Sequence, residues 1–218
     1  MNDKKINQVE RFSLLHEILN ASTHGIGIVL SIIGTYFLYQ KSFSLGISSN
    51  HVIAALIIYC ITLNLFLLSS TLFHALIFTR AAKYLQKLDH TAIFLIILGT
   101  YTAFIWIFIN NKNGWILWWV ILGLTVIGIL YDLLATKQRR WFLTSIYLLI
   151  GWIVVIILPD LIDSLPKIST WLLIAGGITY SLGTIFYIAK KIPLNHVWWH
   201  ILVLIGTFLI YLSIYTAL

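Results

Sequence analysis

Seven long apolar stretches, separated by short polar breaks, constrain this chain more than any other feature of its sequence. They run approximately over residues 20–40, 52–78, 90–109, 115–134, 142–158, 170–189 and 194–216. A helix needs about 20 apolar residues to cross the hydrocarbon core of a bilayer. Backbone groups in lipid must also find hydrogen-bond partners within the protein, which a helix provides. The stretches therefore predict an all-α membrane protein with seven transmembrane helices.

The composition supports this class and argues against a nucleic-acid-binding protein. Only 10% of the residues are charged, whereas a soluble domain carries about 25%. The net charge of +7 comes from basic residues in short loops, so we expect no nucleic-acid partner. We predict a polar N-terminal segment over residues 1–16 and a single seven-helix domain over residues 17–218. Nothing in the sequence points to a particular oligomeric state.

The distribution of lysine and arginine predicts the orientation of the helices. Three of these residues, Lys41, Lys112 and Lys167, fall in loops on one side of the membrane. The other eleven fall on the side of the N-terminus: Lys4, Lys5, Arg11, Arg80, Lys83, Lys87, Lys137, Arg139, Arg140, Lys190 and Lys191. Cytoplasmic loops carry the excess of basic residues. The N-terminus is therefore expected in the cytoplasm and the C-terminus outside, and no cleaved signal peptide is expected before the first span.

The last apolar stretch begins with two histidines, His196 and His200, which lie four residues apart. This spacing puts both rings on one face of a helix, where two imidazoles can bind one metal ion. With the predicted topology, His74 and Asp89 lie at a similar depth near the ends of the second and third spans, and Ser70 lies one turn before His74.

Three imidazoles and a water molecule form an open zinc site, and a neighbouring carboxylate can orient that water or accept its proton. A histidine inside a membrane can instead form a hydrogen bond to another helix. The combination of three histidines and Asp89 at one depth favours the metal site. His16 is expected in solvent, His51 on the opposite side of the membrane, and His90 turned away from the face that carries Asp89. His24 is either a further polar contact of the site or a residue at a helix cap.

The polar residues also form four motifs along the chain, which together cover positions 17–200. They are Glu17-x-x-Asn20-x-x-Thr23-His24, Ser70-x-x-x-His74, Leu88-Asp89-His90 with Gly99-Thr100-Tyr101-Thr102, and His196-x-x-x-His200. In this order they resemble the hemolysin III family. That family is the bacterial branch of the progestin and adipoQ receptor group, which includes the adiponectin receptors.

The resemblance implies a multi-pass protein of the bacterial plasma membrane with a zinc ion near the cytoplasmic face. It assigns the zinc ligands to His74, His196 and His200 and a water-contacting role to Asp89. Ser70 corresponds to a serine near the metal in the receptor branch. Three further residues match the bacterial signature without an assigned role: Glu17, Asn20 and His24. The chain has Ala103 where the family pattern has a proline, which should alter a bend in the third span.

The leading hypothesis for function is a zinc-dependent hydrolase that acts on an amide or ester of a membrane lipid. Asp89 would serve as the general base, and Ser70 would bind the developing oxyanion or the water. Analogy with ceramidase-like membrane enzymes supports this hypothesis. The alternative is a non-catalytic zinc protein in lipid homeostasis or signalling. A cytolysin is less favoured, because the spans have no long polar face to line a wide pore. A proton or ion pathway is a further alternative, since histidine and aspartate residues inside a membrane also mark proton relays.

Overall fold

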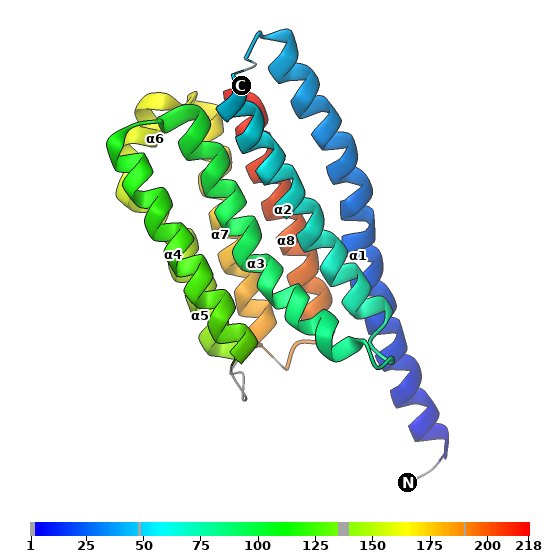
Figure 1. The fold of residues 1–218 in the computed structure, drawn as a ribbon. Helices are drawn as coiled ribbons and strands as arrows, with labels where there is room; N and C mark the ends of the chain where they lie inside the picture. The colour runs from blue at the N-terminus through cyan, green and yellow to red at the C-terminus, as the bar shows by residue number, and fades with distance from the viewer. Residues whose placement is uncertain (1–2, 48, 135–139, 190) are drawn as a thin grey trace.

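The computed structural model describes residues 3–47, 49–134, 140–189 and 191–218, and within these ranges the chain is helical and contains no strand (Figure 1). The elements are α1 (Asp3–Ser44), α2 (Asn50–Ala75), α3 (Ala82–Phe104), a π-helical segment (Ile105–Ile109), α4 (Lys112–Leu134), α5 (Arg140–Trp152), a 3-10 segment (Ile153–Ile157), α6 (Leu158–Ser164), α7 (Lys167–Ile188) and α8 (Asn195–Ala217). Seven helical segments of this part of the chain are long and apolar enough to cross a membrane. The predicted fold class is confirmed, while the orientation of the termini stays a prediction.

Three of the seven spans form the interior of the bundle. In the most apolar 18 residues of each span, the buried share is 56% for α3, 50% for α2 and 44% for α8. In the other four spans it is 28% or less. α1 packs against α2 and α8 along the outside of the bundle, and its N-terminal end extends beyond the other helices (Figure 1). The three interior helices are the ones that carry the predicted metal-binding and catalytic residues.

Two spans differ in extent from the sequence prediction. The polar N-terminal segment is helical from Asp3 and continuous with the first span. The fifth span, predicted to end at residue 158, continues to Ser164 through α5, the 3-10 segment and α6. Pro159 lies at the start of α6, where a proline is tolerated because its missing N–H would have no partner in the first turn. The predicted break at residues 136–140 falls largely outside the described residues, as do Lys137, Arg139 and Lys190.

Small residues bring α7 and α8 close together and so fix the position of the last helix. A Cβ atom added at Gly176 would lie 2.7 Å from Cγ1 of Ile210 and 3.2 Å from the backbone oxygen of Gly206. Helices in membranes pack closely through such small residues. Tyr180 on α7 also forms a hydrogen bond of 2.8 Å with Thr207 on α8. These contacts hold the helix that carries two of the three clustered histidines.

Candidate metal centre

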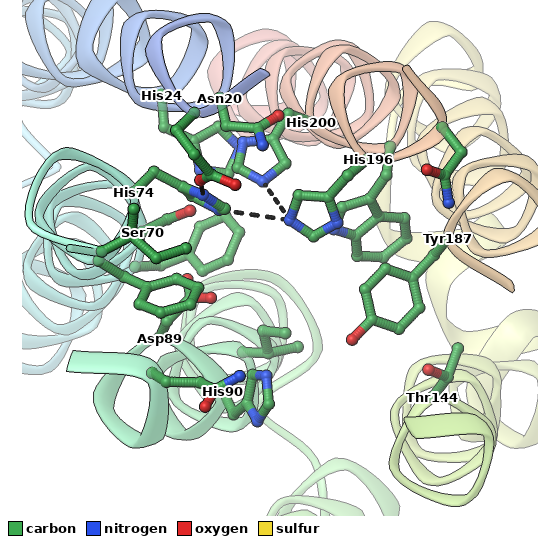
Figure 2. Close-up of a pocket in the computed structure, with 18 of the residues that line it drawn as sticks. Asn20, His24, Ser70, His74, Asp89, His90, Thr144, Tyr187, His196 and His200 are labelled. Carbon is green, nitrogen blue, oxygen red and sulfur yellow. Dashed lines mark hydrogen bonds and ion pairs between the residues drawn. The ribbon is translucent and has the colours of Figure 1, made fainter. Parts of the chain in front are cut away.

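Three histidine side chains converge at the end of the bundle where α2 ends and α8 begins. Nε2 of His74 lies 3.3 Å from Nε2 of His196, which in turn lies 3.2 Å from Nε2 of His200 (Figure 2). One ring nitrogen of each residue lies within 4.8 Å of the other two. His74 and His200 are buried, and His196 is half-buried. The sequence prediction that these three residues meet at one depth agrees with this geometry.

The local structure explains how α8 presents two of the rings. Leu194 has a left-handed backbone conformation, with φ of 56°, and the helix begins at the next residue. His196 therefore lies in the first turn of α8 and His200 one turn later on the same face. His74 lies in the last turn of α2, immediately before that helix ends at Ala75.

Two of the three spacings between these nitrogens match those of tetrahedral metal ligands, and the third pair lies within 4.8 Å. Zinc–nitrogen bonds of about 2.0–2.1 Å in a tetrahedron place neighbouring ligand atoms about 3.3 Å apart. The two Nε2–Nε2 distances of 3.3 and 3.2 Å match this value. Neutral imidazole nitrogens are ligands for zinc, copper, iron and nickel. His74, His196 and His200 could therefore hold a metal ion of this kind.

α1 contributes a second set of polar side chains around the histidine cluster. Oε2 of Glu17 lies 2.6 Å from Nδ1 of His74. Oγ1 of Thr23 lies 3.5 Å from Nδ1 of His200, and the ring of His24 stacks on that of His200 with 4.0 Å between centroids. Asn20 and His24 are both buried. His24 lies far inside α1 rather than at a helix cap, and its contact with the cluster is the stacking of its ring on that of His200.

The histidine cluster opens into a cavity of about 400 Å³ between α1, α2, α3, α5, α7 and α8. Ser70 and Asp89 lie side by side on its wall, next to His74 (Figure 2). Tyr187 and Thr144 line the side across from them. The metal-ligand candidates and the two predicted catalytic residues thus share one cavity, and the carboxylate and hydroxyl groups stand at its wall.

Two histidines lie elsewhere than the sequence predicted. His16, expected in solvent, is half-buried and lines the cavity. His90, expected to turn away from the site, also lines the cavity beside Asp89.

A buried carboxylate that the sequence analysis did not single out lies behind this wall. Asp132 on α4 is fully buried, and its Oδ1 lies 3.6 Å from Nδ1 of His90. A charged residue inside an apolar span is rare and is usually functional or paired. The lone aspartate in the apolar run 115–134 was the signal that could have revealed it.

Comparison with known proteins places these residues in context. A family model described as haemolysin-III related matches residues 12–211. A protein named Hemolysin-3 from Bacillus cereus is 34% identical over 211 residues, which cover 97% of this chain and 95% of that protein. A protein named Hemolysin-3 homolog from Bacillus subtilis (strain 168) is 38% identical over 196 residues, which cover 90% of this chain and 91% of the relative.

Proposed function

Because the chain belongs to the haemolysin-III-related family and carries three converging imidazoles beside a polar cavity, we propose that it is a zinc-dependent hydrolase of a membrane lipid. The bond cleaved would be an amide or an ester. The protein would act in the bacterial plasma membrane, with its N-terminus in the cytoplasm and the site in the cytoplasmic half of the bilayer.

The observation that carries this proposal is the position of Asp89. Its carboxylate lies in the same cavity as His74, His196 and His200 rather than in a separate part of the bundle. Ligand pockets have volumes of about 300–1,000 Å³, so the cavity of about 400 Å³ has room for the linkage region of a lipid. A purely structural metal site would be closed by a fourth protein ligand.

In the proposed hydrolysis, the zinc ion, Asp89 and Ser70 would each have a distinct role. A zinc ion bound to the three histidines would supply Lewis acidity to a carbonyl group and to a water molecule. The Asp89 carboxylate would accept a proton from the attacking water and transfer it to the departing nitrogen or oxygen as the bond to the acyl carbon breaks. The Ser70 hydroxyl would donate a hydrogen bond to the oxygen on which negative charge develops.

The location of the site suits a lipid substrate. Large apolar side chains cover the outward faces of the spans, including Ile26, Leu30 and Ile127, as expected for helices that contact acyl chains. The histidine cluster lies at one end of the bundle, near the last turn of α2 and the first turns of α8. A carbonyl group near the headgroup boundary of a lipid would reach this depth.

The test is zinc content and lipid turnover measured on the same purified protein. We expect about one zinc ion per chain, and its loss from a His196→Ala, His200→Ala double variant; full zinc retention by that variant would contradict the ligand assignment. Asp89→Asn should retain zinc while its turnover of a lipid amide or ester falls by a factor of about 10² or more.

Asp163→Asn is the matched control, because this exposed carboxylate lies in α6, at the end of the fifth span. It should retain both zinc and turnover. If the zinc-loaded wild-type protein hydrolyses none of a broad panel of amide-linked and ester-linked lipids, the protein is a non-catalytic zinc protein instead.

A further inference from the structure

The contacts between α1 and the histidine cluster have no part in the proposed reaction. Glu17, Asn20, Thr23 and His24 follow one another at the spacing that puts them on one face of a helix, and this face of α1 lies against the cluster (Figure 2). The metal-ligand candidates themselves come from α2 and α8. α1 therefore lies beside the proposed metal site, while the three candidate ligands come from other helices.

Glu17 determines which nitrogen of His74 carries the hydrogen. A carboxylate can only accept hydrogen bonds, and a neutral imidazole has one N–H donor and one lone-pair nitrogen. With Oε2 of Glu17 2.6 Å from Nδ1 of His74, Nδ1 is the donor. The lone pair of His74 is then on Nε2, the atom that faces His196 at 3.3 Å.

Thr23 acts in the same way on His200. The Thr23 hydroxyl donates its own hydrogen to the backbone oxygen of Asn20 at 2.8 Å. Its oxygen can therefore only accept from Nδ1 of His200, 3.5 Å away. The Asn20 backbone is a second hydrogen-bond acceptor near the His200 ring, and the stacked ring of His24 limits rotation of that ring. The lone pair of His200 is then also on Nε2, which faces His196 at 3.2 Å.

We propose that α1 supplies the outer hydrogen-bond layer of the metal site, in which Glu17 and Thr23 hold His74 and His200 with their Nε2 lone pairs directed at the metal. Both are positioning residues. Metal-ligating histidines usually donate their other N–H to a carboxylate, carbonyl or water, and loss of such a partner lowers metal affinity by about 10–100-fold. The inference rests on the proposed metal site but does not depend on catalysis.

The test is the affinity of the purified full-length protein for Zn²⁺, measured by competition with a chromophoric chelator. Glu17→Ala should weaken zinc binding by about 10–100-fold. Glu17→Gln should recover most of this loss, because its amide oxygen still accepts from Nδ1. Thr23→Val should cause a smaller loss, since its contact is longer, and Thr23→Ser should bind zinc like the wild type.

Ser31→Ala is the matched control for a general loosening of α1. The Ser31 hydroxyl donates a 2.8 Å hydrogen bond to Oδ1 of Asn64, so this variant also removes a contact between α1 and α2, but away from the histidines. It should leave zinc affinity unchanged. Nitrogen-15 NMR of histidine in the metal-free protein gives a second readout: the Nδ1–H form of His74 should dominate in the wild type and lose its dominance in Glu17→Ala.

Wild-type zinc affinity in both Glu17→Ala and Thr23→Val would overturn the inference. An equal loss in Ser31→Ala and Glu17→Ala would also overturn it, because helix docking alone would then explain the effect. A wild-type protein that binds zinc but hydrolyses no lipid would refute the hydrolase and leave this inference standing. A wild-type protein that binds neither Zn²⁺ nor Co²⁺ would refute both.

Discussion

Replacing Gly128 by alanine should destabilise the protein, because the α3–α4 interface leaves no room for a methyl group there. A Cβ atom at Gly128 would lie 2.2, 2.4 and 2.9 Å from three ring carbons of Phe94. The Phe94 ring cannot retreat easily, since it is fully buried and packs edge-on against Tyr147 with 4.7 Å between centroids. Tyr147 in turn lines the cavity and donates a hydrogen bond to the backbone oxygen of His90.

The expected size of the effect follows from two opposing terms. Alanine is favoured over glycine inside a helix by about 0.5–1 kcal/mol. Forcing an extra methyl group into a filled interior lowers stability by about 1–3 kcal/mol. Gly123 lies on the same helix, and a Cβ atom there would have nothing within 4 Å. Gly123→Ala should therefore show the favourable term alone, and its free energy of unfolding should exceed that of Gly128→Ala by about 1–3 kcal/mol.

The assay is unfolding of both variants and the wild type by sodium dodecyl sulfate, starting from mixed micelles and followed by circular dichroism. Equal free energies of unfolding for Gly128→Ala and Gly123→Ala would refute the reasoning, since the two variants share the same chemical change in the same helix. A displaced Phe94 should also move Tyr147, so Gly128→Ala alone should alter the cavity wall.

Three further predictions concern the buried pair, the metal and the topology. Asp132→Ala should lower the free energy of unfolding by about 1–3 kcal/mol, because His90 loses its partner at 3.6 Å, and His90→Phe in the same chain should recover part of the loss; unchanged stability of Asp132→Ala would contradict this pairing. Zinc at 100 times its dissociation constant should stabilise the folded protein by about 2.7 kcal/mol, a gain abolished by a chelator and diminished at lower pH, because protons compete with the metal for imidazole nitrogens. Alkaline phosphatase fused after Leu218 should be active outside the cytoplasm and a fluorescent protein fused there should be dark; the reverse pattern would contradict the predicted orientation.

Most of the fold could be predicted because the membrane imposes a length on each apolar helix. The end of α8 near residue 216 and the start of α4 near residue 115 were therefore close to their positions in the structure. Helix ends at prolines were harder to predict. The sequence predicts a helix end at Pro159. In the structure the fifth span continues past this residue, because a proline fits the first turn of the new helix α6.

The candidate site was predictable where its spacing is local and harder to predict where it depends on contacts between helices. His196 and His200 are one turn apart, so their shared face follows from the sequence. The contact of Glu17 with His74 joins residues 57 positions apart, and no periodicity within one helix indicates it. For Asp132, the lone aspartate in an apolar run is a signal, but its contact with His90 on a different helix cannot be predicted from either helix alone.

The division of the site between the first two helices and the last one has a consequence for biosynthesis. His196 follows His74 by 122 residues, so the ribosome adds it roughly 6 to 24 seconds later at about 5–20 residues per second. During this interval the nascent protein has Glu17 and His74 but only one of the three proposed ligands. A chain that stops before α8 could insert six spans and still lack two of them, so under the proposed ligand assignment metal would bind only after α8 has been made and inserted.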